Sequence, residues 1–175
     1  MRTDPLLEGL TPGRGAEAPD AGPEARRGGS RLVIHIDGAA RGNPGPAGIG
    51  VMLDGGAGPV RTLYRYIGET TNNVAEYEAL LLALREAQGL HPAGVRIRSD
   101  SELLVRQIQG RYRVKSPRLA TLYAQARTLI QQLSTADCRF SIEHIGRELN
   151  RQADALANRA IDEALSALPN TRSRS

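Results

Sequence analysis

The sequence predicts an α/β fold in which helices pack on a mixed β-sheet. Three short apolar segments follow one another within residues 32–67, and each has the length and β-branched content typical of a strand. From residue 70 onward, segments with helical spacing of apolar residues alternate with two more strand-like segments. Three consecutive strands followed by strand–helix alternation indicate a sheet that contains both antiparallel and parallel pairs.

The first three strands are separated by glycine-rich segments. Residues 32–37 form the first strand, which ends at Asp37, and residues 38–48 are expected to form a Gly/Pro-rich loop. Residues 49–53 form the second strand, and the Asp-Gly-Gly sequence that follows it is a hairpin signal. Residues 60–67 are therefore expected to return as a third strand, antiparallel to the second.

A helix and a fourth strand come next. Residues 70–73 are Thr and Asn, the types that cap helix N-termini, and helical spacing of apolar residues follows as far as Leu84. Gly89 and Pro92 are expected to end this helix. Val95 and Ile97 then mark a strand that stops at Asp100.

The last third of the chain predicts three helices and one strand. A short helix covers residues 101–109, and Ser116 followed by a proline opens a longer helix that continues to Leu133. Phe140 and Ile142 lie on the fifth strand, and Asn150 is expected to cap the last helix. The apolar side of that helix is formed by Ala153, Leu156, Ala157, Ala160 and Ile161.

Composition indicates one soluble domain. The chain has 175 residues, of which 40% are hydrophobic, and we expect a folded domain at residues 31–168 between disordered tails at 1–30 and 169–175. Cys138 is the only cysteine, no apolar run could span a bilayer, and the N-terminus lacks an apolar signal core. These features predict a cytoplasmic protein with no membrane partner. The net charge of +4 is compatible with a polyanionic ligand.

Four acidic residues occupy the ends of predicted elements. Asp37 and Asp100 end the first and fourth strands, whereas Glu76 and Asp154 lie in the first turns of helices. Each has an ordinary structural explanation, because acids stabilise helix N-termini and Asp often starts a turn. If the first and fourth strands are neighbours, however, all four carboxylates could converge at one edge of the sheet.

Such a cluster predicts a divalent metal centre. Carboxylates gathered without matching cations repel one another, and Mg²⁺ prefers oxygen ligands of this kind. Two such ions can activate a water molecule and stabilise the leaving oxygen of a phosphodiester.

Four sequence motifs carry a resemblance to a known family. IDGAARGNPGP at residues 36–46, TTNNVAE at 70–76, SDS at 99–101 and NRQADALA at 150–157 resemble, in order and spacing, the four motifs of type 1 ribonuclease H. The second motif has the family's pattern T-x-N-x-x-x-E. The resemblance covers the whole predicted domain.

The resemblance implies a ribonuclease H-like fold, an activity and a metal requirement. The fold is a five-stranded mixed sheet of order 3-2-1-4-5 with helices on both faces. The activity is endonucleolytic hydrolysis of the RNA strand of RNA–DNA hybrids, which leaves 5′-phosphate and 3′-hydroxyl ends. Two Mg²⁺ ions, with Mn²⁺ as a substitute, are implied at the four acids. Asp37 would bridge both ions, Glu76 and Asp100 would complete one site, and Asp154 would complete the other.

The same resemblance assigns substrate contacts. Hybrids are recognised by shape and by 2′-hydroxyl groups, so short polar donors are expected beside the metals. The positions that match are Gly38, Asn43, Thr71, Asn72, Asn73 and Glu102. Thr71 matches a residue that holds a DNA phosphate, and Glu102 stands where many relatives carry Gln.

Two residues match groups that assist catalysis in relatives. His144 has the spacing of a histidine that helps to activate water or release product, while Arg147 matches an arginine that serves instead in other relatives. On strand alternation His144 shares a side with Phe140 and Ile142, so a packed structural histidine is the alternative. The sequence leaves His144 and Arg147 equally placed.

Several alternatives remain open from the sequence. The segment between Gly110 and Pro117 leaves no room for the basic protrusion of some relatives, and no hybrid-binding domain precedes the motifs. We therefore expect a short-form enzyme that acts as a monomer. Cleavage of double-stranded RNA as well, or hybrid binding without catalysis, are the other hypotheses.

Overall fold

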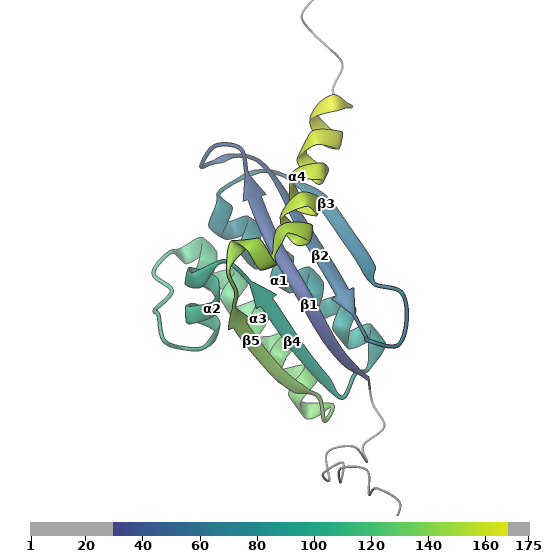
Figure 1. Ribbon diagram of the computed structural model, residues 1–175. Coiled ribbons are helices and arrows are strands. Elements are labelled where there is room, and N and C mark those ends of the chain that lie inside the picture. The colour runs from purple at the N-terminus through teal and green to yellow at the C-terminus, as the bar shows by residue number, and fades with distance from the viewer. Residues whose placement is uncertain (1–29, 168–175) are drawn as a thin grey trace, which may run out of the picture.

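The computed structural model describes residues 30–167, which form a five-stranded sheet flanked by helices (Figure 1). The tails expected at residues 1–30 and 169–175 lie outside this range except for Ser30. The elements, in chain order, are β1 (Arg31–Ala40), β2 (Gly45–Asp54), β3 (Arg61–Thr70), α1 (Asn72–Leu90), β4 (Gly94–Ser99), α2 (Glu102–Ile108), α3 (Pro117–Thr135), β5 (Arg139–His144), the 3-10 turn η2 (Arg147–Leu149) and α4 (Arg151–Ser166).

The sheet order is β3-β2-β1-β4-β5, which confirms the expected topology. β1 pairs antiparallel with β2 and parallel with β4, and β5 continues the parallel half. Because β1 and β4 are parallel neighbours, their carboxyl ends lie at the same edge of the sheet. This arrangement brings Asp37 and Asp100 together.

The loop expected at residues 38–48 is wrong in extent. β1 continues to Ala40 and β2 begins at Gly45, with pairs such as Gly38↔Ile49 and Ala40↔Ala47. Gly and Ala extend these strands because helices pack so closely on them that larger side chains have no room. Glycine is typical of loops, but at Gly38, Gly48 and Gly50 it marks close packing of a helix on a strand.

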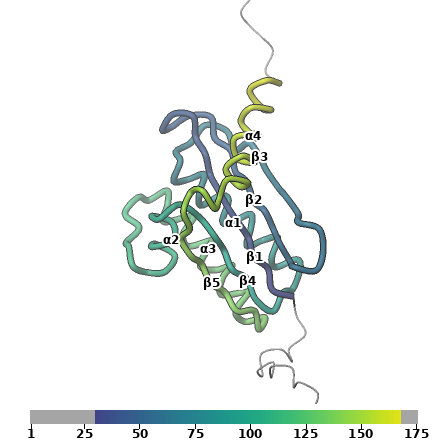
Figure 2. The backbone as a smooth tube through the Cα atoms, in the orientation of Figure 1, coloured from purple at the N-terminus to yellow at the C-terminus, as the bar shows by residue number. Residues whose placement is uncertain are grey.

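Helices cover both faces of the sheet, as expected (Figures 1 and 2). α1 packs against β1 where a Cβ atom at Gly38 would overlap the backbone of Ala75 and Glu76. α4 packs on the opposite face, where a Cβ atom at Gly50 would overlap the carbonyl oxygen of Ala153. α3 packs against α1 and β5. The tube in Figure 2 shows the yellow α4 crossing β1 and β2.

The helix starts agree with the sequence in three of four cases. The side chains of Thr71, Ser101 and Ser116 each accept a hydrogen bond from a backbone N–H three residues later, at the starts of α1, α2 and α3. Asn150 stands at the N-cap position of α4, but its side chain makes no capping bond. No helix within residues 30–167 has both the length and the apolar content needed to cross a membrane.

Candidate active site

Three of the four predicted carboxylates meet just beyond the point where the parallel pairing of β1 and β4 ends. One oxygen from each of Asp37, Glu76 and Asp100 lies within 4.8 Å of the other two. Asp37 projects from β1, Asp100 follows the end of β4, and Glu76 comes from α1. The close contact at Gly38 sets how far α1 approaches the sheet, and so brings Glu76 to the two aspartates.

Asp154 lies apart from this three-carboxylate cluster. Its side chain is exposed on α4, and one carboxylate oxygen accepts a 3.2 Å hydrogen bond from Asn158. Its negative charge still contributes to the raised pKa of Asp37, so it stands near the cluster at the solvent side. Glu76 also departs from expectation, because α1 begins at Asn72 and its first turn contains no acid.

Burial and mutual repulsion disfavour the charged forms of these acids. Asp37 is 5% exposed and Glu76 4% exposed. Desolvation, then the charges of Asp100 and Asp154, and a hydrogen bond with Asp100 raise the pKa of Asp37 to about 8. Burial and the neighbouring Asp37 and Asp100 also raise the pKa of Glu76 well above its usual value, while a hydrogen bond from the Gly38 backbone opposes that shift.

The cluster has the properties of a divalent cation site. Its ligand atoms are hard carboxylate oxygens, which Mg²⁺ and related ions prefer. The Glu76 Oε2 atom is buried and has no hydrogen-bond partner within residues 30–167. A buried carboxylate oxygen without a donor is costly unless a cation supplies the missing interaction. The donor set and this unpartnered oxygen therefore fit a metal ion.

The raised pKa of Asp37 predicts how stability depends on pH without metal. The folded protein holds this proton up to about pH 8, whereas the unfolded chain releases it near 3.8. The folded state thus binds more protons between these values, so its free energy of unfolding falls as pH rises through this window. In EDTA, we expect Tm to fall by several degrees between pH 5 and 8, measured by thermal unfolding.

Asp37→Asn provides the control for this pH dependence. The variant cannot ionise at residue 37, so its Tm should change less over the same window, and Mg²⁺ should raise the wild-type Tm most at the alkaline end. Equal slopes in the two proteins would contradict the proposed origin of the effect.

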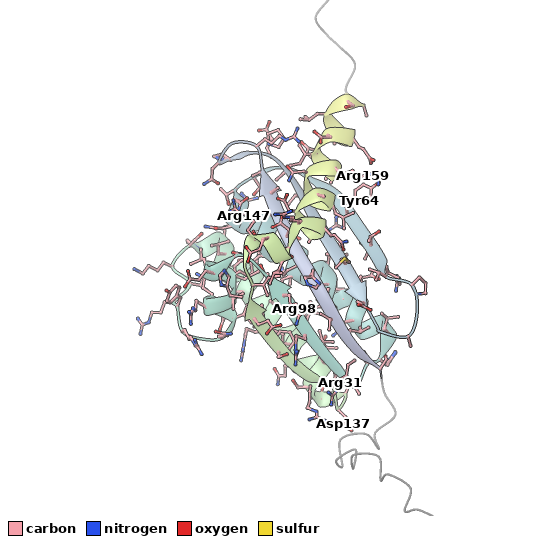
Figure 3. All side chains as sticks on the ribbon, viewed as in Figure 1. Arg31, Tyr64, Arg98, Asp137, Arg147 and Arg159 are labelled. Atoms are coloured by element: carbon pink, nitrogen blue, oxygen red, sulfur yellow. The ribbon has the colours of Figure 1, made fainter. Side chains whose placement is uncertain are left out.

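Three further side chains lie beside Asp100, two at its carboxylate and one at its backbone oxygen. Asn150 Nδ2 donates to Asp100 Oδ1 at 3.1 Å, and Arg147 Nε lies 3.5 Å from Asp100 Oδ2. His144 Nε2 lies 3.3 Å from the backbone oxygen of Asp100. His144 is exposed, which contradicts the packed structural histidine considered from the sequence. Figure 3 shows Arg147 beside the start of α4.

Four of the six predicted substrate residues lie at the start of α1 and in the β1–β2 turn beside it. Asn43, in the turn between β1 and β2, accepts a 3.2 Å hydrogen bond from the Asn72 backbone. Asn72 and Asn73 are exposed in the first turn of α1, next to the capping Thr71. The structure thus brings Asn43 to the same place as the three residues at the helix start.

Glu102, the predicted contact on α2, lies on the protein surface. Its side chain is exposed in the first turn of α2, and it forms a 3.5 Å ion pair with Arg106 one turn later. Sequence analysis missed the contact between Asn150 and Asp100, because an Asn before a helix looks like a simple cap. The ion pair between Arg147 and Asp100 also had no local signal, since the two residues lie on different elements.

Comparisons with known proteins agree with this fold and site. A family model described as "Reverse transcriptase-like" matches residues 35–160. Ribonuclease HI of Halobacterium salinarum is 41% identical over 137 residues, which cover 78% of this chain and 67% of that protein. The bifunctional protein Rv2228c of Mycobacterium tuberculosis is 40% identical over 136 residues, but the chain spans only 36% of its length.

Solved structures give the same result. LC11-RNase H1, crystallised in complex with an RNA/DNA hybrid, is 47% identical, with a TM-score of 0.70 that covers 77% of this chain and 99% of that one. With four family motifs in register, the expected strand order, and relatives of this identity, the chain belongs to the type 1 ribonuclease H family and is a ribonuclease H enzyme.

Proposed function

We propose that this enzyme hydrolyses the RNA strand of RNA–DNA hybrids by metal-dependent endonucleolytic cleavage, as a monomer. The observation that carries the proposal is the three-carboxylate cluster of Asp37, Glu76 and Asp100. Asp37 lies on β1, Asp100 follows the neighbouring strand β4, and Glu76 lies on α1. The hybrid bound to LC11-RNase H1, at 47% identity, supports the choice of substrate. The products are a 5′-phosphate and a 3′-hydroxyl.

The four acids are proposed to be the ligands of two metal ions. In this proposal Asp37 would be a ligand in both of two Mg²⁺ sites. Glu76 and Asp100 would complete the first site, and the exposed Asp154 would complete the second. Mn²⁺ could replace Mg²⁺ in both. Such ions, when bound, supply Lewis-acid activation of water and stabilisation of the leaving oxygen. Asp154 lies outside the cluster but near Asp37, which is compatible with a more open second site.

The start of α1 is proposed to hold the nucleic acid. The N-terminus of α1 attracts phosphate oxygens, because the aligned peptide dipoles of a helix give this end a partial positive charge. Thr71 would contact a phosphate of the DNA strand. Asn43, Asn72 and Asn73, with the Gly38 backbone and Glu102, would contact the sugar edge of the shallow minor groove, where the 2′-hydroxyl groups distinguish RNA.

A substrate panel tests this function. The enzyme is incubated with a hybrid, duplex RNA, duplex DNA and single-stranded RNA of one sequence, each with Mg²⁺, Mn²⁺ or EDTA. We expect internal cleavage of the RNA in the hybrid with either metal and none in EDTA. Equal cleavage of duplex RNA would widen the substrate class. Cleavage in EDTA, or hybrid binding that never leads to cleavage, would contradict the proposal.

His144 and Arg147 are proposed to do different tasks beside Asp100. His144 is exposed beside the Asp100 backbone, and an imidazole is the side chain that most often acts as general acid or base, whereas the Arg147 guanidinium lies beside the Asp100 carboxylate and its positive charge offsets the negative cluster. We expect His144→Ala to lower kcat by about 10²-fold with little change in KM.

Arg147→Ala should mainly weaken substrate or metal binding, with Tm preserved because its side chain is 90% exposed. Steady-state kinetics on a hybrid would measure both, and the reverse pattern would exchange the roles.

A further inference from the structure

We infer that Asn150 is a positioning residue that holds the Asp37 and Asp100 carboxylates in register for metal binding. The inference rests on the proposed metal site, and it concerns a side chain that does not itself belong to the carboxylate set. Asn150 is 1% exposed, in the short segment that joins η2 to α4.

The amide of Asn150 links β1 to the residue that follows β4, just beyond the point where the pairing of these two strands ends. Its Nδ2 group donates to the Ile36 backbone oxygen at 2.9 Å and to Asp100 Oδ1 at 3.1 Å. Ile36 immediately precedes Asp37, so one amide group is bonded to the backbone that carries one acid and to the side chain of another. Both N–H bonds of the amide are used, which fixes the orientation of the side chain.

The β1–β4 ladder explains why this link is needed. The last paired residues of that ladder are His35 and Arg98, so Ile36 and Asp100 lie beyond the regular pairing. At this position the Asn150 amide supplies the donor to the Ile36 oxygen in place of a neighbouring strand. It thereby holds β1 and the end of β4 together at the position where Asp37 and Asp100 repel each other.

Asn150 is not explained as a helix cap. The residue types that cap helices include Asn, but this side chain makes no capping hydrogen bond to α4. Its remaining polar atom, Oδ1, is buried and has no partner within residues 30–167. Burying an amide in this way has a cost that the bonds to Ile36 and Asp100 offset. The conformation is therefore selected by the site and not by the helix start.

Groups that orient metal ligands commonly affect metal affinity by about 10- to 100-fold. We therefore compare Asn150→Leu, which keeps the branched shape of the side chain and removes the donor, and Asn150→Ala, which removes both. Gln152→Leu is the matched control, because it makes the same amide-to-leucine change at an exposed site on the first turn of α4. Mg²⁺ and Mn²⁺ affinities are measured by calorimetry without substrate, together with Tm in EDTA and in Mg²⁺.

Both Asn150 variants are expected to raise the metal Kd at least about tenfold and to reduce the rise in Tm that Mg²⁺ produces. On hybrid, kcat should fall more than KM rises. Gln152→Leu should retain the wild-type metal Kd. A purely structural role would lower Tm in EDTA but leave the metal Kd of the folded protein unchanged, and that result would overturn the inference. If Asn150→Leu fails to fold, Asn150→Ala decides the question, and if both fail, Asn150→Ser, which keeps a donor, replaces them.

The experiment separates this inference from the proposed function. If the wild-type protein neither binds divalent metal nor cleaves hybrid, the metal site itself is wrong. If the wild-type protein does both and the Asn150 variants match it in metal Kd, only the positioning role is wrong.

Discussion

Asp37→Asn is expected to abolish hybrid cleavage while leaving the fold intact. The substitution removes one charge from the centre of the cluster, where Asp37 faces both Glu76 and Asp100. The amide keeps the shape of the side chain but is a poor ligand for Mg²⁺, and we expect kcat to fall by at least about 10²- to 10³-fold. Initial rates on a labelled hybrid in Mg²⁺ measure the effect.

The thermal stability of Asp37→Asn provides a second, independent test of this prediction. Because burial and repulsion disfavour the Asp37 carboxylate, removing its charge should leave Tm in EDTA at neutral pH unchanged or higher. The gain in Tm on adding Mg²⁺ should be lost. A variant that retains both full activity and the metal-dependent gain would show that Asp37 is not a ligand.

Gly38→Ala is expected to have the largest effect on the fold near the site. The added methyl group would overlap the backbone of Ala75 and Glu76, and backbone atoms cannot move aside as a flexible side chain can. Overpacking of this kind costs about 1–3 kcal/mol or more in the free energy of unfolding. Any relief requires α1 to move away from β1 and to carry Glu76 with it, so Mg²⁺-dependent activity should fall as well.

Gly89→Ala is the matched control for this prediction. Gly89 lies near the end of the same helix, and a Cβ atom there would meet nothing within 4 Å. Alanine favours the helix by up to about 1 kcal/mol relative to glycine, so this variant should be as stable as the wild type or more stable. Urea unfolding and hybrid cleavage are measured for both. Wild-type stability in Gly38→Ala would contradict the close packing of α1 on β1.

Local signals in the sequence were sufficient for most elements. The strands and the helix starts at Thr71 and Ser116 depend on residues within a few positions of one another, so a single sequence records them. The sequence placed Asp37 at the end of the first strand and Glu76 in the first turn of a helix, and both placements are wrong, because β1 continues to Ala40 and the first turn of α1 contains no acid. The strand order and the assignment of each acid to a particular ion came instead from the resemblance of four motifs to type 1 ribonuclease H. The structure and the comparisons confirm that order and the family.

Only the tertiary structure decided how closely the four acids approach one another. The sequence predicted that all four acids converge at one place. The packing of α1 and α4 instead places Glu76 inside the cluster and Asp154 at its solvent side. Asn150 had the local signal of a cap, yet its donor serves Ile36, 114 residues away. Contacts of this kind depend on which surfaces pack together over the whole domain. A short stretch of sequence therefore predicts the element that carries a side chain, while the partner of that side chain is set by the fold.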